Sequence, residues 1–286
     1  MAIETLMQII ANGLVRGGVY ILVALGLTLV LSIMNIVNFA HGQFYMLGAF
    51  VVYYLASILH VNFVMAIVAA MLVVGVFAML VERLTFRHLR GQFLQGLIIA
   101  ISLSWLIETG ALLFFGPDEK GVAPPIPGKL NIFGAVVSNE KMILVVVCAL
   151  LTVGLSLLVF KTKFGRAVRA IAQDEEAALM LGISVDRISA LAFGLGCAIA
   201  AAAGGLIAPV LFVSPFMGME MLIKALAVII LGGMGSFGGV VLGGLLLGFV
   251  ESFGLTYLGY GANLLSFGII VLVLLVRPTG FFGHAE

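Results

Sequence analysis

Residues 222–258 read LIKALAVIILGGMGSFGGVVLGGLLLGFVESFGLTYL, an apolar run that a glycine-rich stretch at 232–239 interrupts. A helix of about 20 apolar residues crosses the hydrocarbon core of a bilayer. The run is therefore too long for one simple span and too short for two full ones. We interpret it as two helical pieces that meet at a turn within the membrane. Such a turn is tolerated only where protein or a water-filled cavity surrounds it.

Similar apolar runs recur along the whole chain. The chain is 63% hydrophobic and only 9% charged, with a mean hydropathy of +1.28, which leaves too little polar side chain to cover a water-soluble surface. Many of its 36 glycines fall inside the runs, where small residues let membrane helices pack closely. We expect one domain over residues 1–286, an all-α, polytopic transmembrane helical bundle of about eight to nine spans including broken or re-entrant segments. The predicted spans are 10–37, 39–59, 63–81, 93–115, 142–160, 188–212, the broken run and 264–276.

Composition also excludes several classes of function. The 14 basic and 13 acidic residues give a net charge of +1, so we expect no nucleic-acid partner. The two cysteines, Cys148 and Cys197, form no CxxC pair, and we expect neither a metal site nor a cofactor. The chain has no GxxxxGK[ST] phosphate-binding loop, so any ATP-derived energy has to come from another polypeptide, and we expect no enzymatic activity of its own.

The distribution of lysine and arginine predicts the orientation. The stretches 82–90 and 161–187 are rich in arginine and lysine, whereas the proline-rich loop 116–141 has balanced charge. The positive-inside rule places the two basic stretches in the cytoplasm and the balanced loop outside. The N-terminus is then external. Arg277 indicates a cytoplasmic C-terminus, which requires 222–258 to cross the membrane twice.

The segment 161–187 carries nine of the charged residues. Its part 166–178 is rich in alanine and predicts one continuous helix with Arg166 and Arg169 on the same face, which Gly182 ends. Two interpretations remain open. The helix lies on the bilayer surface as an amphipathic element, or it is a docking helix for a cytoplasmic partner.

Polar side chains also gather at a second, milder break around residues 35–43. They either satisfy freed backbone groups or, together with the turn at 232–236, line a polar constriction on a translocation path. The candidate path residues are Asn35, Asn38, His41, Gln43, Gly232, Gly233, Gly235, Ser236 and Glu251.

Three more charged residues lie within or near apolar runs. Arg16, Glu108 and Glu251 each either pair across the bundle or line the path. For Arg16 we favour snorkelling to the interface, which is also an alternative for Glu108. For Glu251 a lining role and a structural hydrogen bond remain equally open.

An ordered set of motifs runs through nearly the whole chain. It comprises NFAHG at 38–42, ER at 82–83, GRA at 165–167, EAA at 176–178, LGI at 181–183, DR at 186–187, LGGMGS at 231–236, GGL at 243–245 and LLVRPTG at 274–280. This set resembles the shorter permease subunit of branched-chain amino acid ABC importers. The EAA motif followed by Gly182 resembles the cytoplasmic loop of ABC importer permeases, although the Ile-x-Leu-Pro that follows in those proteins is missing here.

The resemblance implies a subunit of the bacterial inner membrane that passes branched-chain or hydrophobic amino acids. It implies as partners a second, usually longer permease, two ABC ATPase subunits and an extracytoplasmic substrate-binding protein, with membrane lipid around the bundle. It makes 161–188 a cytoplasmic coupling segment, which we call the coupling segment below. The residues that it assigns to ATPase coupling are Gly165, Arg166, Arg169, Asp174, Glu176, Gly182, Asp186 and Arg187.

Two other functions remain open from the sequence. A permease of the same type could carry urea or short amides. A stand-alone, ion-coupled secondary transporter would use the acids Glu108 and Glu251 instead of a docking helix.

Overall fold

The computed structural model describes residues 2–34, 36–132, 135–277 and 280–282. Within these ranges, six helices are long and apolar enough to cross a membrane. They are α1 (Ala2–Met34), α3 (Phe63–Leu84), α4 (Phe93–Phe115), α5 (Asn139–Lys161), α8 (Val185–Ile207) and α10 (Phe237–Leu258). Three shorter apolar elements join them: α2 (His41–Val52) with its π-helical continuation η1 (Tyr53–Ile58), α9 (Met217–Gly232) and α11 (Ala262–Val276). The expectation of an all-α, polytopic bundle with broken segments is confirmed.

The helices α1 and α8 form the centre of the bundle, and both are buried along most of their length. Helix α1 packs against α8 and α10, and α8 packs against α2 and α3 as well. Gly26 of α1 and Gly196 of α8 face each other so closely that a Cβ on either would collide with the carbonyl oxygen of the other. Small residues thus let these helices approach at backbone distance, which is a common basis of helix packing in membranes.

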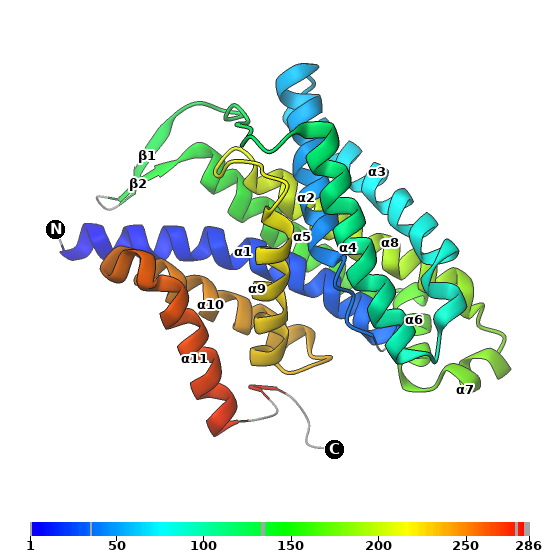
Figure 1. Ribbon diagram of the computed structural model, residues 1–286. Coiled ribbons are helices and arrows are strands. Elements are labelled where there is room, and N and C mark those ends of the chain that lie inside the picture. Colours follow the sequence, from blue (N-terminus) through cyan, green and yellow to red (C-terminus); the bar gives the residue numbers. More distant parts are fainter. Residues whose placement is uncertain (1, 35, 133–134, 278–279, 283–286) are drawn as a thin grey trace.

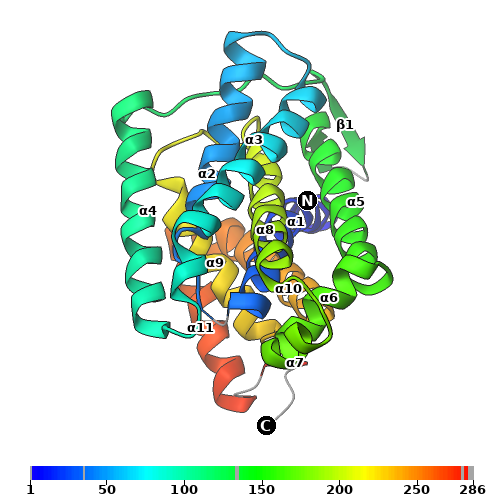
Figure 2. The same cartoon turned by 90° about the vertical axis from the view of Figure 1, so that its right-hand side faces the viewer.

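The two ends of the bundle differ in structure (Figures 1 and 2). At one end, which we call the hairpin end, the antiparallel strands β1 (Lys129–Ile132) and β2 (Ala135–Ser138) pack beside the N-terminal half of α1. At the opposite end, the basic end, lie α6 (Lys163–Gln173), α7 (Glu175–Met180) and the 3-10 turn η2 (Phe86–Leu89). The chain between 280 and 282 joins the end of α9 through hydrogen bonds from the Phe281 and Phe282 amides to Leu231 and Gly232.

The run that we expected to break within the membrane does form two helices, α9 and α10, separated by the turn 233–236. The predicted place of that turn is wrong. It lies at the basic end, where Met234 is 74% exposed, and it shares a cavity of about 640 Å³ with Arg169 of α6. The reason is that Gly232 and Gly239 allow backbone contact, so α9 and α10 form a tight helical hairpin.

The predicted single helix over 166–178 is also wrong, because the chain breaks at Asp174. The backbone of Asp174 is extended, with φ −158° and ψ 108°, and it separates α6 from α7. Its carboxylate Oδ1 accepts a hydrogen bond of 3.0 Å from the Ala177 amide. An aspartate at the N-cap stabilises a new helix start, which outweighs the helical propensity of the surrounding alanines.

Candidate functional site

The coupling segment starts with a capped helix held against α5. Thr162 Oγ1 accepts a hydrogen bond of 3.1 Å from the Gly165 amide and caps α6. Gly165 is buried, and a Cβ at this position would collide with the Val159 carbonyl oxygen near the end of α5. The glycine is therefore required for α6 to turn sharply away from the membrane-spanning helix.

Helix α7 ends in a Schellman motif. Gly182 adopts φ +78°, its amide donates to Leu179 O (2.9 Å), and the Ile183 amide donates to Ala178 O (3.1 Å). Together with the cap at Asp174, this makes α6 and α7 two short helices with fixed ends. The coupling segment is thus an elbow rather than the single rod that the alanine content suggested.

The tip of this elbow is apolar and exposed. Leu179, Met180 and Leu181 are 54%, 87% and 80% exposed. Arg166, Glu176 and Arg187 of the same segment are exposed as well. We call Leu179, Met180 and Leu181 the apolar tip. An exposed apolar patch near charged residues is typical of a protein-binding surface.

The two arginines that the sequence placed on one helix face behave differently. Arg166 is exposed. Arg169 turns back, donates a hydrogen bond from Nη1 to the Val159 carbonyl oxygen and lies over the Phe160 ring at 5.6 Å from its centroid. Arg169 therefore fixes α6 to the end of α5, whereas Arg166 is available to a partner.

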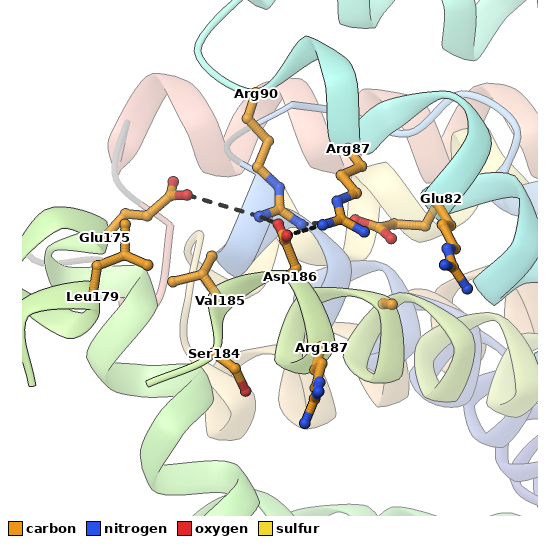
Figure 3. A pocket seen from close by; sticks show the side chains of 11 residues that line it. Glu82, Arg87, Arg90, Glu175, Leu179, Ser184, Val185, Asp186 and Arg187 are labelled. Carbon is orange, nitrogen blue, oxygen red and sulfur yellow. Dashed lines mark hydrogen bonds and ion pairs between the residues drawn. The ribbon is translucent and has the colours of Figure 1, made fainter. Parts of the chain in front are cut away.

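A cluster of ion pairs joins the coupling segment to the loop between α3 and α4 (Figure 3). Arg90 donates to Glu82 Oε1 (2.8 Å) and Asp186 Oδ1 (2.9 Å), and it lies 3.9 Å from Glu175 Oε1. Arg87 also pairs with Asp186. We call these five residues the arginine clamp, and they line a cavity of about 670 Å³. Figure 3 shows Arg187 pointing away from Arg90, toward the other side of α8.

In the sequence, Arg87 and Arg90 indicate orientation only, and no motif there connects them to Asp186. The available signal was that the two basic stretches on the same predicted side also contain acids, so that Arg87 and Arg90 of one could pair with Asp186 of the other. Pairing across 96 residues depends on how α3 packs against α8, which the sequence alone does not give.

The polar residues of the first break lie inside the bundle, beside the middle of α1. His41 is buried, with Nε2 3.2 Å from the Val23 carbonyl oxygen. Asn38 is buried too, and its Oδ1 accepts a hydrogen bond from the Ala40 amide. The Asn38 contact satisfies a backbone amide at the break, whereas His41 contacts a carbonyl of α1. Asn35 lies outside the described residues.

Gln43 links the same region to α4. Its Nε2 donates to Ser104 Oγ (3.2 Å) and Glu108 Oε2 (3.0 Å). Glu108 was expected to pair across the bundle, to line the path or to reach the interface by snorkelling. In the structure it pairs across the bundle with Gln43. Ser104 was not among the candidates, because a serine in an apolar run is common in membrane helices.

The turn residues do not join this cluster. Gly232, Gly233, Gly235 and Ser236 belong to the hairpin between α9 and α10 at the basic end, where Ser236 Oγ caps α10 by accepting from the Gly239 amide (3.0 Å). The two groups that we expected to share one constriction are therefore apart.

Glu251 sits in a third cluster, between α1, α9 and α10. Its Oε1 accepts from Arg16 Nη1 (2.8 Å) and Lys224 Nζ (2.9 Å), and Tyr20 donates to Oε2. Lys224 also pairs with Glu220 at 2.8 Å. The snorkelling expected of Arg16 is wrong, because its guanidinium pairs with an acid inside the protein.

Tyr20 and Lys224 were missed as partners of Glu251. The sequence did contain a hint of the pairing with Lys224, since this lysine lies in the same apolar run as Glu251. Buried charges in a membrane protein pair with one another.

Comparison with known proteins shows the family of this chain. The profile of the family described as "Branched-chain amino acid transport system / permease component" matches residues 9–276. The chain belongs to this family.

Two curated relatives match it along nearly their full length, and a longer one over part of its length. The high-affinity branched-chain amino acid transport system permease protein BraD of Pseudomonas aeruginosa is 36% identical over 98% of this chain and 96% of BraD. The permease protein LivH of Escherichia coli K12 is 33% identical over 98% of this chain and 96% of LivH. The longer permease LivM of Salmonella typhimurium is 29% identical over 92% of this chain but only 67% of LivM.

A solved structure shares the fold. The structure titled PsaBC from Streptococcus pneumoniae in complex with Fab aligns with a TM-score of 0.53 over 94% of this chain and 91% of that chain, at 13% identity. At that identity the likeness concerns the fold alone. The family and the helices together make the chain a permease and a multi-pass protein of the inner membrane.

Proposed function

We propose that this chain is the permease subunit of an ABC importer that carries branched-chain or other hydrophobic amino acids, with ATP hydrolysed by separate subunits. The family membership over residues 9–276 supports the class of protein. The observation that carries the mechanism is the elbow of α6 and α7, which presents the apolar tip at the basic end. A membrane protein without its own phosphate-binding loop needs such a docking surface to receive work from an ATPase.

In this proposal residues 1–286 act as one permease domain and 161–188 is its coupling segment. The basic end faces the cytoplasm, as the positive-inside rule expects. The apolar tip enters a groove of the ATPase, and exposed Arg166, Glu176 and Arg187 contact its rim. Gly165, Asp174 and Gly182 fix the shape of the elbow, so that it moves as one body.

The arginine clamp then transmits this motion to the bundle. Through Arg90, a displacement of α7 or α8 acts on the loop between α3 and α4. Because the contact between Arg90 and Glu175 is long, at 3.9 Å, it is the link with most freedom to change as the elbow moves. Alternating access would follow as a rigid-body shift of packed helices.

The partners follow from the same scheme. A second permease would complete the path, and the match to the longer LivM suggests that it is a longer homologue. Two ATPases would bind at the basic end, and an extracytoplasmic binding protein would dock at the hairpin end. We place amino acids above urea or short amides as substrate because the relatives BraD and LivH are named for branched-chain amino acids. An ion-coupled transporter is disfavoured because Glu251, which would have to bind the coupling ion, already pairs with Arg16 and Lys224.

The test is co-purification of the ATPase subunits with Leu181→Asp, compared with Leu130→Asp in the hairpin. Both positions are exposed leucines, and both substitutions add the same charge. We expect Leu181→Asp to lose the ATPase subunits and ATP-driven leucine uptake while it inserts normally, and Leu130→Asp to keep the ATPase subunits. Normal ATPase binding and uptake by Leu181→Asp would contradict the proposal.

A further inference from the structure

A cavity of about 370 Å³ opens at the hairpin end of the bundle and shares Arg16 with the Glu251 cluster. It lies between α1, α5, α10 and the turn that follows α8. Its polar lining consists of Asn12, Arg16, Lys141, Ser252 and Thr256. The rest of the wall is aliphatic, with Val15 and Leu255 among its members. Its place at the hairpin end follows from Lys141, which lies in the first turn of α5 directly after β2.

The lining carries two cations and no acid among the described residues that form it. Lys141 Nζ donates to the neutral amide oxygen of Asn12 at 2.9 Å. Arg16 pairs through Nη1 with Glu251, but that carboxylate also accepts from Lys224 and Tyr20. Lys224 also pairs with Glu220, so Glu251 and Glu220 together balance Arg16 and Lys224. The positive charge at the cavity that no acid of its lining balances is that of Lys141.

Arg16 adds a second cationic donor to the cavity beside Lys141. Its side chain remains 30% exposed although it lies in a membrane-crossing helix. A charged group at such a place faces water or a counter-charge, since lipid would be too costly. Guanidinium nitrogens that Glu251 does not use are available to a second carboxylate, whose geometry suits the planar fork of arginine.

The cavity also has the size and character of a small-molecule site. Ligand pockets of about 300–1,000 Å³ combine apolar walls with a few polar groups that fix orientation. Here the two cations would orient an acid group, and the aliphatic wall of Val15 and Leu255 would receive an apolar side chain. A free amino acid with an aliphatic side chain has both parts.

We propose that this cavity binds a free hydrophobic amino acid, with its carboxylate held by Arg16 and Lys141 and its side chain against the aliphatic wall. The inference rests on the proposed function and deepens it, because it gives the permease a substrate site of its own at the outer end. We commit to the free amino acid rather than an acidic side chain of the binding protein, because the aliphatic wall of Val15 and Leu255 beside the two cations suits a ligand that carries both a carboxylate and an apolar side chain.

The experiment measures binding of radiolabelled L-leucine to the permease–ATPase complex in nanodiscs, without binding protein. The test variant is Lys141→Gln, and the matched control is Lys129→Gln, an exposed lysine of β1 at the same end. We expect Lys141→Gln to weaken leucine binding about tenfold or more and Lys129→Gln to leave it unchanged. Leucinol, which lacks the carboxylate, should not compete with leucine.

Three outcomes would overturn the inference. They are the absence of leucine binding to the unaltered complex, equal competition by leucinol, and unchanged leucine binding in Lys141→Gln. A second assay measures docking of the binding protein to each variant. It tests whether the carboxylate that the cations bind belongs to an acidic residue of the binding protein. If Lys141→Gln weakens only that docking, the cations serve an acidic residue of the binding protein and the inference is wrong. If the unaltered complex transports no hydrophobic amino acid, the proposed function itself fails.

Discussion

The guanidinium of Arg90 and the carboxylate of Asp186 lie 2.9 Å apart although 96 residues separate them in the sequence. Through the same guanidinium, Arg90 also holds the buried Glu82 at the end of α3. One side chain thus connects the end of a membrane helix with the start of α8, next to the elbow of α6 and α7. This connection links the elbow, and with it the apolar tip, to the loop between α3 and α4.

We predict that Arg90→Gln uncouples transport from ATP hydrolysis. The variant loses its charge-assisted hydrogen bonds, each worth about 1.5–3 kcal/mol, and leaves Glu82 buried without its cation. Leucine uptake by proteoliposomes should fall about tenfold or more, while the ATPase subunits stay bound and hydrolyse ATP. Arg83→Gln is the control, since Arg83 is exposed in the same region and forms no ion pair within the described residues. Equal uptake by both variants would show that the clamp does not transmit motion.

The cluster around Glu251 predicts a large effect on stability. Glu251→Ala leaves Arg16 and Lys224 in the bundle without their shared acid. Breaking a buried ion pair from one side costs about 3–5 kcal/mol, so we expect a clear fall in the thermal midpoint of the purified complex. Glu220→Ala removes the other acid that pairs with Lys224. Because Glu220 is 68% exposed, this substitution should lower the free energy of unfolding by only about 1 kcal/mol or less. Similar midpoints for the two variants would contradict this account.

Close packing at the centre of the bundle makes another prediction. Gly26→Ala puts a methyl group where Gly196 O lies, so α1 and α8 have to move apart. Overpacking of this kind costs about 1–3 kcal/mol. Gly154→Ala in α5 is a matched control, because a Cβ there meets nothing within 4 Å. Gly26→Ala should lower the midpoint of thermal unfolding in detergent, and Gly154→Ala should not. Equal midpoints for the two variants would argue against backbone contact between α1 and α8.

The two arginines of α6 should separate into different phenotypes. Arg166→Glu should weaken ATPase binding and leave the stability of the permease unchanged, because Arg166 is exposed. Arg169→Glu should also lower the thermal midpoint, because it removes the contacts with Val159 and Phe160. The comparison needs both measurements on both variants. A lower midpoint for Arg166→Glu alone would reverse the assignment.

Apolar runs and the glycine content predicted the class of fold because they reflect local requirements of a bilayer. The same local reasoning located the helix break before His41 and the helix end at Gly182. It failed at Asp174, where a single capping side chain outweighs the propensity of several alanines. It also failed for the turn 233–236, because contact between Gly232 and Gly239 decides its place, and that contact depends on the packing of two helices.

The candidate sites were predictable only where neighbouring residues form them. The coupling segment is continuous in sequence, so its motif and charges could single it out as a candidate. The Glu251 cluster joins three helices, and the arginine clamp joins the end of α3 and the loop after it with α7 and the start of α8. The sequence showed that Arg16 and Glu251 were unusual for a membrane span, but it could not show that they meet.

The central claim is that the apolar tip faces the cytoplasm, where an ATPase can bind it. The measurement is labelling of Met180→Cys with a membrane-impermeant maleimide in spheroplasts, before and after permeabilisation, with Lys129→Cys as the reference for the hairpin end. The native Cys148 and Cys197 are buried and should give little background. We predict that Met180→Cys reacts only after permeabilisation and Lys129→Cys reacts before it. Reaction of Met180→Cys in sealed spheroplasts would place the elbow outside the cell and contradict the account.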